Sequence, residues 1–248
     1  MDRSLATALS VVADASRVAR AVQHNLASVH KITKDDRSPV TVADFAVQAV
    51  VAMGLADALG PTLIVGEEHA QALRAADQKP VLDAVLEAVH GFRPRATADD
   101  VLSAIDSCNH DATAETFWTL DPIDGTKGFL RGQQYAIALA LIDRGEVAMG
   151  VMGCPNLPID PAAPLDVADA QGTLYSAQRG HGTWEHAWAN PGQAPRRVFA
   201  ADFDDERPIR ACESVEAAHS KHDDTAPVLQ MLCDGGRSGT SARLDSQC

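Results

Sequence analysis

Apolar residues recur at helical spacing along the first part of the chain. The residues that follow this spacing are Leu5, Leu9, Val12, Val18, Val22, Leu26 and Val29. Because side chains three or four positions apart share one helix face, this set predicts an amphipathic helix, which the polar run KITKDDRSP ends. The segment VTVADFAVQAVVAMGLADALG predicts a second helix, with Thr41 as a candidate N-cap and Gly60 just beyond its end.

Shorter apolar runs bounded by turn residues follow these helices. PTLIVG predicts a short buried strand that leads into GEEHA, and TFWTL predicts the next strand. QYAIALALIDRGEVAMGVMGC predicts two strands around a turn at residues 143–145, and GTLYSAQRGHGTWEH has the same hairpin character. Residues 71–111 are polar and helix-prone with few core signals, so we expect a surface excursion there. The mixture of helices and strands predicts an α/β (α+β) fold.

A polar stretch rich in proline and glycine, NPGQAPRR, precedes the run VFAADF. Domain boundaries commonly fall in such stretches. We therefore expect an N-terminal α+β domain over residues 1–204 and the start of a second, α/β domain over residues 205–248.

Charge and cysteine content narrow the classes of function. The chain has 21 Lys and Arg against 34 Asp and Glu, a formal charge of -13, which argues against general binding to a nucleic acid polymer or an anionic membrane. Its 5 cysteines are odd in number and form no C-x-x-C pair, as is typical of a reducing compartment. The N-terminus lacks the continuous apolar core of a signal peptide, and no segment approaches a transmembrane span. We expect a cytoplasmic protein, with an organellar form left open.

The stretch WTLDPIDGTKGFLRGQQY carries the strongest chemical signal. Asp121 comes directly after a predicted strand, where Pro122 cannot continue the hydrogen-bonded ladder and Gly125 permits a sharp turn. This geometry points the carboxylates of Asp121 and Asp124 toward one centre, with the carbonyl of Ile123 between them. Mg²⁺ prefers such oxygen ligands and keeps waters for a substrate phosphate.

Other polar residues are placed to complete this site. Glu67 and Glu68 follow another strand, and strand ends in α/β sheets gather at one crevice. Carboxylates that bridge two ions form the clamp used in phosphate ester hydrolysis. A helix that starts near Gly125 would turn its free N–H groups toward the phosphate. Asp44 and the hydroxyl of Thr126 are candidates to orient the attacking water.

Each of these residues also has a purely structural interpretation. Asp44 fits the third position of a capping box begun three residues earlier, and an isolated D-P-x-D-G is commonly an ordinary turn. Glu67 and Glu68 alone would fit a solvated helix start, and Lys127 and Arg131 a solvated helix face. The conjunction of three acidic sites, each beside a strand end or a helix start, favours the functional interpretation.

The spacing of the two aspartates separates this motif from another phosphatase type. Haloacid-dehalogenase sites also contain D-G-T, but their two aspartates lie two positions apart on one face of an extended strand. Here the gap is three. The spacing favours shared metal ligands over a nucleophile with its acid partner.

Over residues 38–247 the chain resembles the 3′(2′),5′-bisphosphate nucleotidases, a branch of the inositol monophosphatase superfamily. The matching segments, in order, are SPVTVADFAVQAVV, IVGEE, WTLDPIDGTKGFLRGQQYAIALALIDRGEVAMGVMGCPNLP, ESVEAAHSKHD and RLDSQ. The G-E-E and D-P-I-D-G-T elements mark the superfamily, and the continuation KGFLRGQQYAIALALI is more specific to the nucleotidase branch.

The resemblance implies a fold and an activity. The fold would be a layered α-β-α-β-α sandwich of the inositol monophosphatase type. The activity would be lithium-sensitive hydrolysis, with two or three Mg²⁺ ions, of the 3′-phosphate of 3′-phosphoadenosine 5′-phosphate (PAP) to give AMP, and of its sulfated relative PAPS. We expect a monomer that acts on these small nucleotides. An inositol phosphate phosphatase of the same superfamily is the alternative, since it shares all the metal residues.

By position, the resemblance also assigns roles to single residues. The residues that match metal ligands are Glu67, Asp121, Asp124 and the carbonyl of Ile123. Asp44 and Thr126 match the water-activating pair. Gly125, Thr126, His219 and Ser246 match positions near the substrate. On the sequence alone, His219 would fit a surface or capping histidine, and Ser246 carries no functional signal.

The C-terminal end departs from the family pattern. In the family, L-D-S-Q is followed by a substrate-binding lysine, an arginine-bearing strand and a W-D motif whose aspartate completes the second metal site. Here Cys248 follows L-D-S-Q and the sequence stops. We therefore expect a C-terminally truncated form, with a non-catalytic product that binds metal or a full-length partner as a second alternative.

Overall fold

The computed structural model describes residues 3–25, 38–160, 162–165, 167–188, 193–200, 208–214, 222–233 and 239–244. The helices are α1 (Arg3–His24), α3 (Ser38–Leu59), α4 (Lys79–His90), α5 (Ala98–Asp106), α6 (Thr126–Arg131) and α7 (His222–Cys233), with 3₁₀ helices η1 (Ala70–Arg74) and η2 (Ala76–Gln78). The strands are β1 (Ile64–Val65), β2 (Thr116–Asp124), β3 (Ala136–Asp143), β4 (Glu146–Cys154), β5 (Thr173–Gln178), β6 (Gly182–Ala187), β7 (Arg196–Val198), β8 (Ile209–Ser214) and β9 (Gly239–Leu244).

The two long helices α1 and α3 confirm the prediction from apolar spacing. Leu26 and Val29, which we placed in the first helix, lie outside the described residues. Helix α3 begins at Ser38, so Thr41 lies inside the helix and the predicted N-cap is wrong. The capping-box interpretation of Asp44 fails for the same reason. Gly60 follows the helix end in a left-handed conformation, with φ +84°, as expected of a C-terminal stop.

A seven-stranded sheet forms the centre of the described chain, in the order β1-β2-β3-β4-β5-β6-β7. Strand β1 runs parallel to β2, and each later pair is antiparallel. The predicted hairpins β3–β4 and β5–β6 are confirmed. Because β1 and β2 are parallel, the loops that follow them leave the same edge of the sheet, and both carry the acidic residues singled out above.

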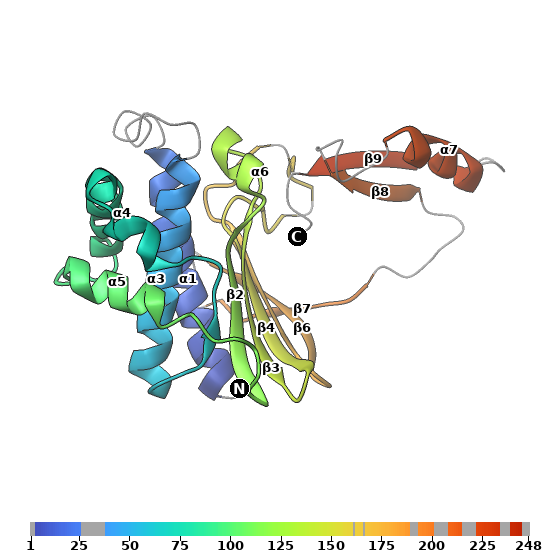
Figure 1. The fold of residues 1–248 in the computed structure, drawn as a ribbon. Helices are drawn as coiled ribbons and strands as arrows, with labels where there is room; N and C mark the ends of the chain where they lie inside the picture. Colours follow the sequence, from blue (N-terminus) through green and yellow to red (C-terminus); the bar gives the residue numbers. More distant parts are fainter. Residues whose placement is uncertain are drawn as a thin grey trace.

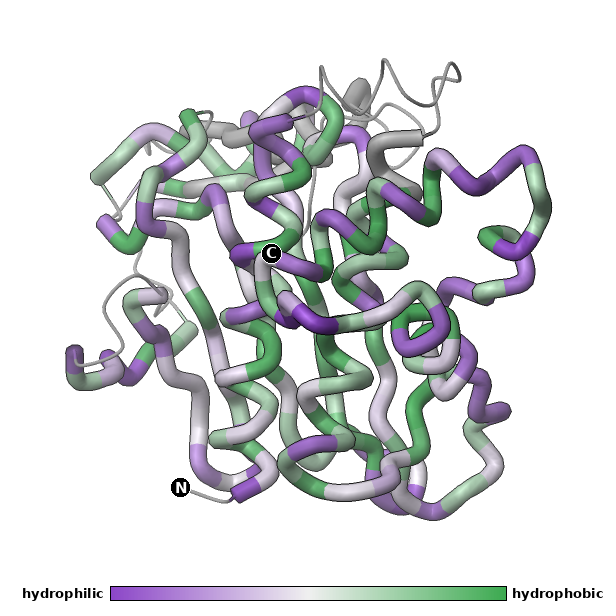
Figure 2. Tube along the Cα trace, turned by 90° about the vertical axis from the view of Figure 1, so that its left-hand side faces the viewer, coloured by the Kyte–Doolittle hydropathy of each residue, from purple (hydrophilic) through white to green (hydrophobic). Residues whose placement is uncertain are grey.

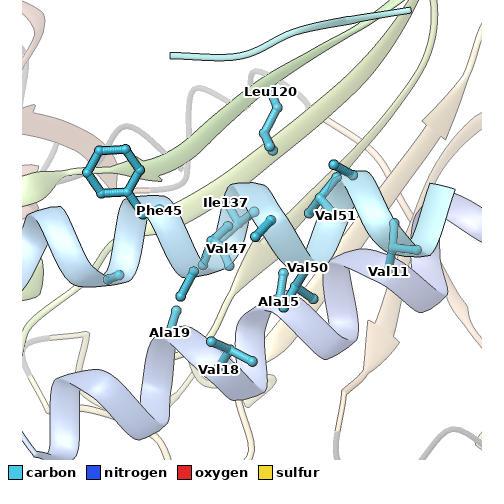
Figure 3. Close-up of a cluster of buried hydrophobic side chains, with 14 of the residues drawn as sticks. Val11, Ala15, Val18, Ala19, Phe45, Val47, Val50, Val51, Leu120 and Ile137 are labelled. Atoms are coloured by element: carbon cyan, nitrogen blue, oxygen red, sulfur yellow. The ribbon is translucent and has the colours of Figure 1, made fainter. Parts of the chain in front are cut away.

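One face of the sheet packs against α1 and α3 (Figure 1). Alternate residues of β2 and β3, such as Leu120 and Ile137, are buried on this face. Figure 3 shows the cluster that results, with Val11, Ala15, Val18 and Ala19 from α1 and Phe45, Val47, Val50 and Val51 from α3 against Leu120 and Ile137. Burial of each large aliphatic side chain contributes about 1.5–3 kcal/mol.

The prediction that residues 71–111 form a surface excursion is wrong. This segment holds α4 and α5, which pack against the side of α3. Its buried residues include Leu73, Val81, Val85, Val89, Val101 and Ile105. The spacing of four between Val81, Val85 and Val89 is the helical signal that the polar composition of the segment concealed.

Helix α3 is more apolar than we expected from the sequence. Among the described helices, its window Val42–Leu59 is long and apolar enough to cross a membrane by length and composition, contrary to our expectation of no such segment. In the structure 72% of that window is buried, because α1, α4, α5 and β2 surround the helix. Its hydropathy is that of a central core helix.

A second, two-stranded sheet pairs β8 with β9 in parallel, and α7 connects them (Figure 1). The expected domain boundary at residue 204 falls in residues 201–207, outside the described chain, and stays a prediction. The mixed sheet with its helices confirms the α/β class. Figure 2 shows hydrophobic residues along the central helices and strands and hydrophilic residues mainly at the periphery.

The close approach of α1 and α3 gives a test of this packing. A Cβ added to Gly54 of α3 would lie 2.4 Å from Cγ1 of Val11. We predict that Gly54→Ala lowers the free energy of unfolding by about 1–3 kcal/mol through overpacking, and that Val11→Ala in the same chain restores part of the loss. The measurement is urea unfolding. Alanine's helix propensity alone would raise stability by about 1 kcal/mol, so a more stable Gly54→Ala chain would contradict the packing.

Candidate active site

A bulge in β2 sets the geometry of the two aspartates. Strand β2 continues through Pro122 to Asp124, whereas we had expected the strand to end at Leu120 and a turn to follow. Asp121 pairs with Ala138 and Asp124 with Ala136, so three steps along β2 match two steps along β3. One extra residue is therefore inserted, as in a β-bulge, at the place where proline has no N–H to donate.

The bulge brings the two carboxylates to the same side of the sheet. In a regular strand, residues three apart point to opposite faces. Their partners Ala138 and Ala136 are two apart and share a face, so the extra residue turns Asp124 to the side of Asp121. The charge of Asp124 accordingly contributes to the raised pKa of Asp121. The register therefore places both aspartates on one side of the sheet, through a bulge in place of the predicted turn, and their convergence on one cation stays a prediction.

The loop after β1 brings two glutamates to this edge. Glu67 is exposed and Glu68 is half-buried, between the end of β1 and the 3₁₀ helix η1. The backbone N–H of Gly66 donates to the carbonyl of Cys108 at 2.8 Å, which ties the loop to the end of α5. Glu67 raises the pKa of Asp121, and it also raises that of Asp44, so the loop faces both β2 and α3.

Asp44 is a buried carboxyl on α3, with 8% of its surface exposed. Burial, followed by the charges of Glu68, Glu67 and Asp121, raises its pKa to about 9. Partial burial with the charges of Glu67 and Asp124 raises the pKa of Asp121 to about 6. Burial and then Glu67 raise the pKa of Glu68. The carboxylates of helix α3, the β1 loop and β2 therefore lie close enough to shift one another's pKa values.

Gly125 and Thr126 lie where the sequence placed them, at the start of α6. Gly125 is left-handed, with φ +84° and ψ 43°, a conformation that glycine adopts without a steric penalty. The hydroxyl of Thr126 donates to the carbonyl of Ile123 at 3.5 Å. Lys127 and Arg131 are exposed on α6. His219 and Ser246 lie outside the described residues, so their predicted substrate contacts stay predictions.

The donor set fits Mg²⁺ by its chemistry. Within the described ranges, no three or more His, Cys, Asp or Glu side chains are already arranged closely enough to hold a metal ion. The carboxylates of Glu67 and Asp124 nevertheless lie near enough to Asp121 that their charges contribute to its raised pKa. Mg²⁺ takes only oxygen ligands and retains several waters, so it needs few protein carboxylates.

Gln48 is a site residue that the sequence reasoning missed. It is completely buried on α3, one helical turn after Asp44, and its side-chain amide contacts the backbone of Glu67 and Glu68. In the sequence it stands as one polar residue inside an apolar helical run. The spacing of four from Asp44 was the available signal, because residues four apart share a helix face.

Comparisons with known proteins show the family of the chain. The model of the inositol monophosphatase family matches residues 1–242. The chain is 39% identical over 227 residues to a 3′(2′),5′-bisphosphate nucleotidase of Schizosaccharomyces pombe, an alignment that covers 87% of this chain and 62% of that protein. It is 35% identical over 257 residues to a 3′(2′),5′-bisphosphate nucleotidase of Oryza sativa, covering 98% of this chain and 70% of the relative.

The fold also matches solved structures. The crystal structure of the extragenic suppressor protein SuhB from Bartonella henselae superposes with a TM-score of 0.57 at 14% identity, covering 99% of this chain and 69% of that one. The expected fold type is therefore confirmed.

The raised pKa values predict how stability depends on pH without metal. An aspartate in the unfolded chain has a pKa near 3.9. In the folded chain the pKa of Asp121 is raised to about 6. As pH rises between these values the unfolded state loses its proton first, so the folded state loses stability. In EDTA, Asp121→Asn should match the wild-type chain near pH 4 and be more stable than it at pH 8. Thermal unfolding across pH measures this. A difference between the two chains that does not change with pH would contradict the clustering.

Proposed function

This chain belongs to the inositol monophosphatase family, and we propose that it releases the 3′-phosphate of PAP, giving AMP and inorganic phosphate, with Mg²⁺ as cofactor. The observation that carries the proposal is the meeting of acidic residues from α3, the β1 loop and the bulged β2, in the chain that is 39% identical to a nucleotidase. PAPS, which carries the same 3′-phosphate, is the second substrate in this proposal.

The metal would be held by the carboxylates of Glu67, Asp121 and Asp124 and by the carbonyl of Ile123. When bound, Mg²⁺ supplies a Lewis acid for the phosphoryl oxygens and lowers the pKa of bound water. Burial, followed by the charges of Glu67 and Asp124, raises the pKa of Asp121, and a bound cation would offset the like-charge part of this effect. The number of ions, two or three, belongs to the proposal.

Asp44 and Thr126 would orient the attacking water and take its proton. In the reaction the water oxygen forms a bond to phosphorus, the bond from phosphorus to the 3′-oxygen breaks, and the leaving oxygen gains a proton. Asp44 keeps its proton near neutrality in the metal-free chain, since its pKa lies at about 9. Positive charge in the cluster favours its ionised form, which can accept a proton. Gly125, His219 and Ser246 would contact the nucleotide.

A phosphatase acting on inositol phosphates is the second candidate. The family match favours it equally, because the family model is that of inositol monophosphatases. The sequence KGFLRGQQY and the identity to nucleotidases from two organisms favour PAP.

We predict that the purified chain releases phosphate from PAP in Mg²⁺, and that Asp44→Asn lowers kcat by about 10²–10⁴-fold, the usual contribution of a general base. Phosphate release under substrate saturation is the measurement. Asp83→Asn is the matched control, because Asp83 is 59% exposed and pairs with Lys79 on α4. Wild-type chain that folds but releases no phosphate would favour the non-catalytic alternative.

We also predict that kcat/KM for PAP exceeds that for inositol 1-phosphate by at least about 10-fold, the ratio that corresponds to 1.4 kcal/mol of differential binding in the transition state. Parallel assays at one Mg²⁺ concentration measure the ratio. A higher kcat/KM for inositol 1-phosphate would select the second candidate.

A further inference from the structure

Gln48 is a neutral side chain at the centre of the acidic site. It lies on α3 with 0% of its surface exposed, and a buried amide is costly unless its polar atoms have partners. Its Nε2 donates to the carbonyl of Glu68 at 2.8 Å and to that of Ile105 at 3.2 Å. Its Oε1 accepts from the N–H of Glu67 at 3.1 Å and of Glu68 at 3.0 Å. Both amide hydrogens and both oxygen lone pairs are therefore used.

The chemistry of these partners requires an amide at this position. Two carbonyls need donors and two N–H groups need an acceptor. An ionised glutamate offers acceptors alone and a lysine offers donors alone. Glutamate would also add a negative charge beside Asp44, which lies one turn away on the same helix. Glutamine satisfies all four backbone groups and adds no charge.

The β1 loop packs closely against this amide. Strand β1 holds only two residues, so its pairing with β2 ends at Val65. A Cβ added to Gly66 would lie 2.6 Å from Oε1 of Gln48 and 2.8 Å from Cβ of Cys108, which shows how closely the loop backbone rests on α3 and the end of α5. The carboxylates of Glu67 and Glu68 lie near Asp44 in this arrangement, since burial of Asp44 and then the charges of both glutamates raise its pKa.

We propose that Gln48 is a positioning residue for the metal site: its side chain fixes the backbone of Glu67 and Glu68 against α3 and so sets the distance between the metal ligand Glu67 and Asp44. This rests on the function proposed above. Gln48 touches the backbone of the ligand loop, and its effect on Mg²⁺ passes through the carboxylate of Glu67. The uncharged amide of Gln48 holds the loop near the other carboxylates in the metal-free chain through these hydrogen bonds.

The test compares two buried glutamines. Gln48→Met keeps a similar volume and removes all four hydrogen bonds. We expect it to weaken Mg²⁺ binding by about 10–100-fold, the usual effect of losing a group that orients a metal ligand. Gln134→Met is the matched control: Gln134 is 5% exposed and donates to the carbonyls of Asn156 and Leu165, away from the β1 loop. The control should lose stability in EDTA and retain wild-type Mg²⁺ affinity.

Titration calorimetry with Mg²⁺ alone measures this affinity, and equal affinities in the two variants would overturn the proposal. Amide hydrogen exchange of the wild-type chain in EDTA is a second measurement that needs no variant. The N–H groups of Glu67 and Glu68 should be protected without metal, since Gln48 accepts from both. Exchange at the rate of an unstructured chain would also overturn it.

These measurements separate the positioning role from the proposed function. A wild-type chain that binds Mg²⁺ and does not hydrolyse PAP would refute the function and leave the role of Gln48 standing. Gln48→Met with unchanged Mg²⁺ affinity would refute the role of Gln48 and leave PAP hydrolysis standing. A wild-type chain that binds no Mg²⁺ would overturn both.

Discussion

The gathering of several carboxyl groups in one partly buried place is the constraint that the candidate site imposes on the rest of the structure. Asp44, Glu67, Glu68 and Asp121 lie near enough to one another that burial and like charge raise the pKa of Asp44 to about 9. Ionisation of all these groups would make them repel one another, and a flexible chain would relieve that repulsion by moving them apart. The fold opposes that movement because the carboxylates stand on three separate parts of the chain, namely α3, the β1 loop and β2, and each part is held by its own contacts.

The anchoring elements differ in how they are held. Helix α3 is surrounded by α1, α4, α5 and β2, so the position of Asp44 is set by apolar burial along the helix. Strand β2 is fixed by its ladder with β3, and its bulge sets the side to which Asp121 and Asp124 project. The β1 loop has less apolar burial than α3 and no strand ladder like that of β2. It is held by side-chain and backbone hydrogen bonds to α3 and α5, and this dependence gives Gln48 its importance.

The sequence allowed the sheet and the main acidic residues to be predicted, because alternating strands and flanking turns are local signals. It did not distinguish a turn at Pro122 from a bulge, since proline and glycine suit both and only the pairing register with β3 separates them. Gln48 was missed because its partners are backbone groups 20 and 57 residues away. The helices of residues 71–111 were underestimated because their charged faces concealed a narrow apolar stripe that α3 covers.

We propose that the bulge in β2 and the β1 loop direct three carboxylates toward one cation. Anomalous diffraction from crystals of the chain grown with Mn²⁺, a cation that also takes oxygen ligands, tests it most directly. We predict an anomalous peak from a Mn²⁺ ion bound to carboxylate oxygens of Glu67, Asp121 and Asp124, with the carbonyl of Ile123 among the ligands. Asp121 and Asp124 on opposite sides of the sheet, or a Mn²⁺ ion bound away from both, would contradict it.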